Sequence, residues 1–337
     1  MQLGIAIQET WSFFHEIYAD LQAHHSTSLF KARQVKLPLL SQRINQLLYQ
    51  QAWSEFLKYN QVVFFEWASE FLSYASQLPK NSGLVTRLHR YEMYHWADKI
   101  NWSAVDKIIL VSQAKKREFN SRFPEQAEKI VVIPEAISPQ RFKPVSKKFE
   151  GDIGILCHLI PRKRVYELIL AFADLDRQRA GFHLHIGGPE YPLHRDYYEA
   201  MQALIVRLGL EDKVTFYGNV DKPDEWYAKI DIFISNGYSE GLQVAPLEAM
   251  ASQRFVLSHW WEGADEMLPV ENLYLTNGEL VERILQYSDA SESERLSCGE
   301  FMRNTVIEKF NIDKTKIQIR NVIEQVGAAR TSTTAPR

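Results

Sequence analysis

The stretch YSEGLQVAPLEAMASQ, residues 238–253, decides how the C-terminal half of the chain is read. It follows DIFISN (231–236), an apolar run that predicts a buried strand, and it continues into a segment typical of a buried helix. Its proline is tolerated only in the first turn of a helix, so the helix is predicted to begin near Val244. The backbone N–H groups of Leu242, Gln243 and Val244 are then predicted to point at an anion above the sheet, most naturally a phosphate.

Two glutamates, Glu240 and Glu248, bracket this helix start. A carboxylate accepts two hydrogen bonds in one plane, which matches neighbouring hydroxyls on a sugar ring. Two carboxylates beside an amide-lined phosphate site therefore fit a ligand that carries a sugar, a diphosphate and a ribose in a row. In the alternative interpretation, Glu240 only complements the helix dipole and Glu248 is an ordinary exposed helical residue.

Both halves of the chain alternate apolar runs with helical patterns joined by short connections. Such repeated strand–helix units predict parallel sheets with helices on both faces. The fold class is therefore α/β, with two Rossmann-like doubly wound domains facing a cleft where open sheets bind ligands. The predicted strands are residues 2–8, 62–68, 83–89, 106–112 and 129–136 in the first half, and 152–159, 182–188, 213–218, 231–236 and 254–259 in the second.

A polar, proline-containing segment without periodicity, RFKPVSKKFEGD (141–152), places the domain boundary. We expect an acceptor-side domain over residues 1–143 and a donor domain over 144–311. A helix over 312–326 can return to the N-terminal domain. The tail from 327 to 337 has no apolar period and is expected to be disordered.

Composition excludes several classes of protein. The chain has 337 residues, is 45% hydrophobic and has a net charge of −3, which describes a globular protein with no overall attraction to nucleic acid. No signal peptide or membrane-spanning run is recognised, and Cys157 and Cys298 lack pairing or ligand spacing. We therefore expect a cytoplasmic protein. Since no His, Asp or Glu cluster has ligand spacing either, neither a metal nor another cofactor is expected.

Several segments resemble, in order, the retaining glycosyltransferases of the GT-B fold, family four. The donor-site signature of that family is a glutamate, seven residues and a second glutamate, here EGLQVAPLEAMA (240–251). The resemblance covers roughly residues 83–311. The other matching segments are IVVIPEAISPQRFKP (130–144), GILCHLIPRKRVYELILAF (154–172), LHIGGPE (184–190), VTFYGNV (214–220) and RFVLSHWWEGADEMLP (254–269).

The resemblance implies three catalytic side chains. Lys163 would contact the donor diphosphate, where a fixed ammonium stabilises the charge of the leaving group. Glu240 would bind hydroxyls of the donor sugar, and His89 would face that sugar from the N-terminal domain. The alternatives are a solvated basic loop for Lys163 and a structural role for His89, with His95 as its competitor.

Further residues would bind the donor. Glu248 would hold the ribose hydroxyls, and Leu242, Gln243 and Val244 would supply amides. Gln243 stands where the family often has a small residue, so it would narrow the pocket.

Three more donor-binding residues are expected around the diphosphate. His158 occupies the place of a family arginine, so Arg162 or Arg164 would take over part of the phosphate contact. Gly188 ends its strand beside the donor, and the alternative for it is a simple tight turn.

The N-terminal half departs from the family. Its first strand leads into AIQETWSFFHEI (6–17), which lacks the glycine pair that many relatives carry there, and Glu135 stands where relatives commonly carry asparagine. Residues 29–59 mix basic with apolar side chains and could make a peripheral contact with an anionic membrane that delivers a lipid-linked acceptor. Packing of this segment on its own domain is the alternative. The basic residues are Lys31, Arg33, Lys36 and Arg43.

The sequence thus predicts an enzyme that transfers a sugar from a nucleotide-diphosphate sugar to an acceptor hydroxyl with retention of configuration. The acceptor would be a glycan, a lipid-linked glycan or a protein, in glycan, glycolipid or polysaccharide synthesis. Two alternatives stay open. One is a noncatalytic scaffold of the same fold that binds a nucleotide sugar or a protein partner. The other is an epimerase or hydrolase.

Overall fold

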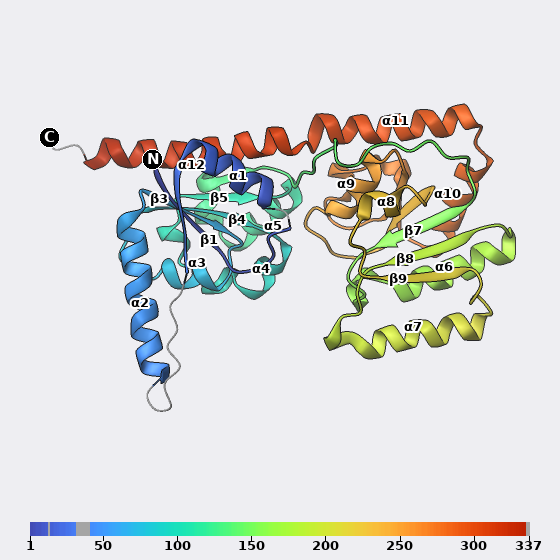
Figure 1. The fold of residues 1–337 in the computed structure, drawn as a ribbon, viewed down its shortest axis with the longest axis horizontal. Helices are drawn as coiled ribbons and strands as arrows, with labels where there is room; N and C mark the ends of the chain where they lie inside the picture. The colour runs from blue at the N-terminus through green and yellow to red at the C-terminus, as the bar shows by residue number, and fades with distance from the viewer. Residues whose placement is uncertain (13, 32–40, 335–337) are drawn as a thin grey trace. The chain divides into compact units, whose positions relative to one another are not determined.

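The computed structural model describes residues 1–12, 14–31 and 41–334. The chain forms two compact units (Figure 1). The first contains Met1–Pro134 together with the chain from Ile312 onward, and the second contains Glu135–Asn311. Each unit is built on a six-stranded sheet whose paired strands are all parallel, which confirms the predicted fold class.

The sheet of the first unit has the strand order β2-β1-β3-β4-β5-β6. Its central strands are buried along their whole length because helices cover both sides. Helices α1 and α12 lie on one face, and α2 to α5 lie on the other. The strands are β1 (Gln2–Ile7), β2 (Ser26–Leu29), β3 (Val62–Glu66), β4 (Gly83–Leu88), β5 (Lys107–Leu110) and β6 (Ile130–Val132). The helices are α1 (His15–His24), α2 (Ser41–Tyr59), α3 (Glu70–Ala75), α4 (Arg90–His95), α5 (Gln113–Arg122) and α12 (Ile312–Thr334).

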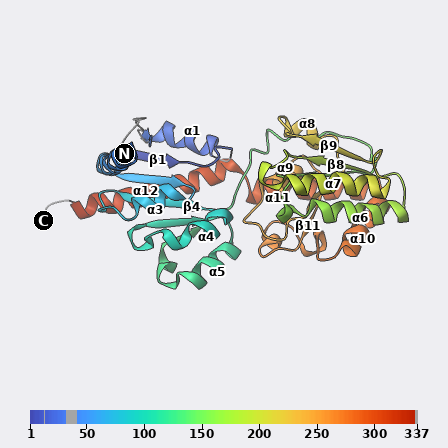
Figure 2. The same cartoon turned by 90° about the horizontal axis from the view of Figure 1, so that it is seen from below.

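The sheet of the second unit has the strand order β12-β11-β10-β7-β8-β9. Figures 1 and 2 show α6 and α7 on one face of this sheet, and α10 packs against α6. Helices α8, α9 and α11 cover the other face. The strands are β7 (Asp152–Leu156), β8 (His183–Gly187), β9 (Val214–Gly218), β10 (Ile232–Ser235), β11 (Phe255–His259) and β12 (Leu273–Tyr274). The helices are α6 (Val165–Gln178), α7 (Arg195–Leu208), α8 (Pro223–Tyr227), α9 (Val244–Ala251), α10 (Asn277–Asp289) and α11 (Glu292–Lys309).

The N-terminal segment of the first unit ends at Pro134, whereas the sequence predicted the boundary between the domains at residue 143. The intervening segment belongs with the second unit because Arg303 of α11 holds it there. The Arg303 guanidinium donates to the backbone carbonyl oxygens of Phe142, at 2.8 Å, and of Pro139, at 3.3 Å. The Phe142 side chain is buried. Polar composition alone therefore misplaced the boundary.

Helix α12 belongs to the first unit, as the sequence suggested, but it continues to Thr334 instead of ending at residue 326. Its buried apolar side chains include Ile319, Ile323 and Val326. Beyond them the helix continues through Gly327, against which the Met1 side chain packs. A helix that packs on a core can extend past its last buried apolar residue, and the hydrophobic period of the sequence does not predict that extension. Residues 335–337 lie outside the described chain.

The basic segment 29–59 is described in part. Arg33 and Lys36 lie outside the described residues. The C-terminal half of α2 buries Trp53 and Leu57 in the core of the first unit, which agrees with the simpler interpretation of this half. Within the part of the chain that the structure describes, no helix is long and apolar enough to cross a bilayer.

The turn after β8 depends on Gly188. Its φ is +133°, a conformation that L side chains rarely adopt, and an added Cβ would lie 1.7 Å from the carbonyl oxygen of Cys157. The Cys157 N–H in turn donates to the carbonyl oxygen of Gly187 at 3.0 Å. A side chain at position 188 would therefore separate the two loops that follow β7 and β8.

We expect Gly188→Ala to lower the free energy of unfolding by more than about 3 kcal/mol, because backbone strain and a backbone clash coincide. Gly209→Ala is the matched control. Its φ is +66° and no heavy atom lies within 4 Å of the added Cβ, so it should cost only about 1 kcal/mol. Urea unfolding of both variants measures the difference, and equal losses would contradict this account of the turn.

Candidate functional site

The loop after β7 ends in a left-handed turn that places two basic side chains. Residues Pro161–Lys163 form a short 3₁₀ turn, and Arg164 follows at φ 52° as the N-cap of α6. Asn236, just after β10, donates through Nδ2 to the Arg164 carbonyl oxygen at 2.7 Å. Its Oδ1 accepts a hydrogen bond from the Tyr274 hydroxyl, also at 2.7 Å. Sequence reasoning missed the buried Asn236, although a polar residue at the end of an apolar strand is a usable signal.

The carboxylate of Glu240 gathers the two predicted cations. Its Oε1 lies 2.9 Å from Lys163 Nζ and 2.5 Å from Arg162 Nη1. Arg162 Nη1 also donates to the carbonyl oxygen of Ser239 at 2.7 Å. Burial alone would raise the pKa of Glu240, but the positive charges of Lys163 and Arg162 outweigh it and hold the pKa below its usual range. The group stays ionised, and its immediate surroundings carry a net positive charge.

Gly237 gives the Glu240 side chain its space. A Cβ added at Gly237 would lie 2.3 Å from Glu240 Oε1. The backbone N–H of the next residue, Tyr238, points at the Arg162 carbonyl oxygen at 3.4 Å. The loop after β10 thus lies directly against the loop after β7. Gly237 is a second residue of the site that the sequence pattern did not single out.

Helix α9 begins at Val244, as predicted, and Gln243 is its N-cap. The Gln243 side chain makes no capping hydrogen bond, and its Oε1 instead accepts a hydrogen bond from the Ser235 hydroxyl. The amides of the first turn have no acceptor within the helix. The Gln243 side chain therefore leaves the end of α9 available for an anion, while Leu242 is buried beside it.

Glu248 lies one turn into α9 and has a different environment. Its Oε2 accepts a hydrogen bond from the buried Tyr227 hydroxyl, and the hydroxyl lies 3.0 Å from both this oxygen and the Ala245 carbonyl oxygen. Burial raises the pKa of Glu248 to about 7. This carboxyl group is therefore partly protonated near neutral pH, in contrast to Glu240. Tyr227, from α8, was not anticipated from the sequence.

His158 is exposed, and its ring meets Tyr191 edge to face at 6.1 Å between centroids. Partial desolvation, followed by the positive charges of Lys163 and Arg162, lowers the pKa of His158. A neutral imidazole supplies less charge than an arginine. Arg162 contacts Glu240 beside Lys163, so a second fixed cation lies next to this carboxylate, and its contact with a phosphate stays a prediction.

His89 lies in the first unit, at the carboxyl end of β4. Its ring is buried, with Nε2 3.2 Å from Glu66 Oε1 and its centroid 4.1 Å from that of Trp67. His95, its competitor, is exposed and stacks on Tyr91. A direct role of His89 at a donor sugar stays a prediction.

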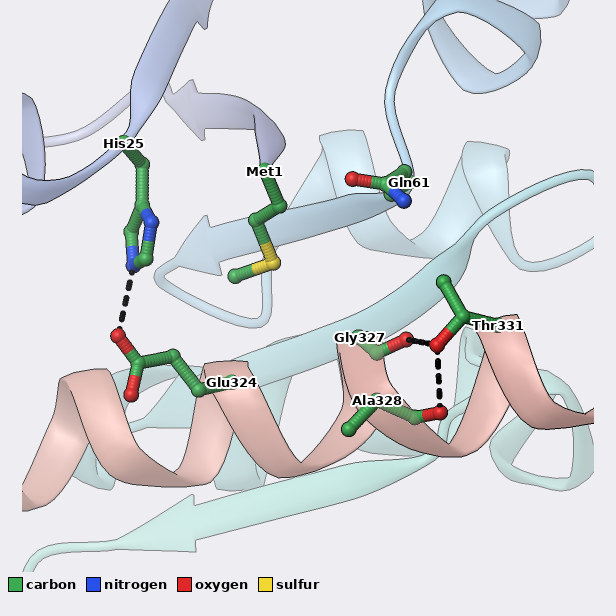
Figure 3. A pocket seen from close by; sticks show the side chains of 7 residues that line it. All are labelled: Met1, His25, Gln61, Glu324, Gly327, Ala328 and Thr331. Atoms are coloured by element: carbon green, nitrogen blue, oxygen red, sulfur yellow. Dashed lines mark hydrogen bonds and ion pairs between the residues drawn. The ribbon is translucent and has the colours of Figure 1, made fainter.

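Figure 3 shows a hollow elsewhere in the first unit, alongside α12. Its volume is about 260 Å³, and none of the predicted site residues lines it. The lining residues are Met1, His25, Gln61, Glu324, Gly327, Ala328 and Thr331. Among the described residues no group of three or more His, Cys, Asp or Glu side chains could hold a metal ion.

The raised pKa of Glu248 predicts a pH-dependent stability. The folded protein binds this proton more tightly than the unfolded chain, so wild-type stability falls as the pH rises from about 4.5 to about 7. We expect Glu248→Gln to remove this loss, gaining up to roughly 3 kcal/mol relative to wild type at pH 8 compared with pH 5. Urea unfolding at both pH values measures it, with the exposed Glu225→Gln as control. The same pH dependence in Glu248→Gln and wild type would contradict the assignment.

Comparison with known proteins adds to this geometry. Residues 150–289 match the family model described as Glycosyl transferases group 1. A lipopolysaccharide core biosynthesis mannosyltransferase, LpcC of Rhizobium leguminosarum, is 28% identical over 27% of this chain and 26% of its own length. An exopolysaccharide phosphotransferase of Streptomyces coelicolor is 28% identical over 44% of this chain and 15% of its own length. The chain therefore spans only a minor part of these curated relatives.

The similarity of the fold extends over nearly the whole chain. The crystal structure of Anabaena HepE in complex with UDP superposes with a TM-score of 0.77 at 18% identity, covering 96% of this chain and 100% of that one. Residues 150–289, within the second unit, are therefore similar to the Glycosyl transferases group 1 family, and the chain as a whole has the two-sheet α/β fold of the GT-B glycosyltransferases.

Proposed function

We propose that this chain is a glycosyltransferase that moves a sugar from a nucleotide-diphosphate sugar to an acceptor hydroxyl. The observation that carries the proposal is the arrangement around Glu240, where Lys163 and Arg162 meet one buried carboxylate beside the start of α9. Fixed cations and first-turn amides suit a diphosphate leaving group. The match to the group 1 family, over residues 150–289, supports the same assignment.

Each part of the donor has a counterpart in the second unit. Lys163 and Arg162 bind the diphosphate, with the amides of Leu242, Gln243 and Val244 as further donors. Glu240 accepts hydrogen bonds from hydroxyls of the sugar, and Glu248 accepts them from the ribose. The positive charge is supplied by side chains, so the proposal needs no metal ion or other cofactor.

The proposal includes retention of configuration. Glu240 already engages two cations, and an anion so engaged is a weak nucleophile. Catalysis then rests on stabilising the leaving diphosphate, mainly through Lys163. The first unit holds the acceptor, with His89 at the carboxyl end of β4 contacting the donor sugar. Transfer to a glycan or a lipid-linked glycan, in the cytoplasm or at the inner face of a membrane, completes the proposal. The names of the two relatives, an exopolysaccharide phosphotransferase and a lipopolysaccharide core biosynthesis mannosyltransferase, favour such acceptors.

A binding screen tests the donor site first. Calorimetry against UDP-, GDP-, ADP- and CMP-sugars should find one donor bound with a micromolar Kd, and Glu248→Ala should abolish that binding because the ribose loses its acceptor. Lys222→Gln, a change at an exposed lysine of the same unit, should bind as wild type does.

Absence of binding to every donor, by a protein that is folded by circular dichroism, would overturn the proposal. Binding without transfer to any acceptor would favour the noncatalytic scaffold. Release of the free sugar, or of an epimerised donor, would favour the hydrolase or epimerase.

With the donor known, Lys163→Met should lower kcat by roughly 10²- to 10³-fold, because one fixed charge on the leaving group is lost. Arg162 still neutralises Glu240 in this variant, so the thermal midpoint should stay close to that of wild type. Initial-rate kinetics measure the effect against Lys222→Gln. A kcat within about threefold of wild type would show that Lys163 is only part of a basic loop.

A further inference from the structure

A buried ion pair joins β3 and β4 at their carboxyl ends in the first unit. Glu66 and Arg87 are direct partners in the parallel register. Arg87 Nε lies 3.0 and 3.1 Å from the two carboxylate oxygens of Glu66, and Nη2 lies 2.6 Å from Oε1. Both side chains are essentially inaccessible to solvent, at 1% and 0% exposure. This geometry is that of a strong, directional pair.

A buried ion pair is weak evidence of a stabilising role in the sheet. Burying two charges is costly, and well-packed apolar residues of similar volume are often as stable or more stable. The strand positions before Glu66 are all apolar, Val62 to Phe65, and they pack without any charge. A buried ion pair among them is therefore weak as an explanation of folding. The presence of the ion pair is better explained by the neighbouring side chain that it orients.

The pair holds His89. Residues 87 and 89 are two apart, so their side chains leave the chain on the same side, and His89 Nε2 lies 3.2 Å from the oxygen that Arg87 grips. Donation to a carboxylate requires that Nε2 carry the proton, which fixes the tautomer of a neutral ring. Trp67, against the His89 ring, has a φ of 76°, a conformation that is strained for a residue other than glycine.

A second buried carboxylate ties the two loops together. Glu92 Oε1 accepts hydrogen bonds from the backbone N–H of Ala68, at 3.0 Å, and of His89, at 3.3 Å. The loop after β3 and the turn after β4 are thus joined around the imidazole. The strained backbone and the buried charges therefore lie at the carboxyl ends of the strands, where parallel sheets bind ligands.

We propose that Glu66 and Arg87 are positioning residues for His89 in the transfer reaction. Arg87 fixes the carboxylate, and the carboxylate fixes the orientation and the tautomer of the imidazole. This inference rests on the proposed function. A positioning role and a purely structural role predict different results. If the pair only positions His89, its effect on the rate requires His89.

The decisive variant replaces the pair by apolar residues, Glu66→Met with Arg87→Leu. It should fold with a urea midpoint equal to or above that of wild type. Affinity for the free nucleoside diphosphate, whose proposed ligands all lie in the second unit, should be unchanged by calorimetry. The kcat should fall roughly 10- to 100-fold, by analogy with the loss that follows removal of a group that orients a metal-binding histidine, and the pH profile of kcat should change. Thr86→Val removes a neighbouring buried hydroxyl and is the matched control, with wild-type kcat.

A double-mutant cycle completes the test. In a His89→Gln background the apolar pair should lower kcat no further, because the path through the imidazole is already gone. Additive losses, or wild-type kcat and pH profile in the apolar pair, would overturn the inference while the donor site stands. An apolar pair that does not fold would also overturn it, since the ion pair would then serve stability. Absence of transfer by the wild-type protein itself would instead be a failure of the proposed function.

Discussion

The ionisation of one buried carboxylate underlies the organisation of the second unit. Burial acting alone would raise the pKa of Glu240, and the carboxyl group stays charged because Lys163 and Arg162 meet it. The same contacts fasten the loop after β7 to the loop after β10. The cations are consequently ordered before any ligand arrives, and their ordering does not have to be offset by the free energy of binding.

The two glutamates of the signature stretch share one helix start but differ in charge. Two cations lower the pKa of Glu240, whereas burial raises the pKa of Glu248 to about 7. Near neutral pH the two glutamates therefore carry one full negative charge and one partial negative charge. The two glutamates therefore repel a diphosphate less than two fully ionised carboxylates would. A protonated Glu248 can also donate a hydrogen bond, which a carboxylate cannot do.

The sequence predicted those features that repeat locally. Apolar runs placed the longer strands but not the short β2 and β12, and a proline that fits only a first turn placed the start of α9 at Val244. Asn236 and Gly237 escaped because their roles depend on a loop more than seventy positions away in the chain. The pairing of Glu66 with Arg87 escaped because strand register is not written in either strand alone. Gly188 was expected beside the donor, but the sequence does not show that the Cys157 carbonyl oxygen occupies the space of a side chain at this position.

The return of α12 to the first unit makes that unit discontinuous along the chain. Gly83 at the start of β4 has no side chain, and Val326 Cγ1 would lie 2.5 Å from a Cβ placed there. The apolar surface beneath α12 thus stays uncovered until the ribosome has translated all of the second unit. Domains generally fold as units during synthesis, but here the N-terminal one is completed last.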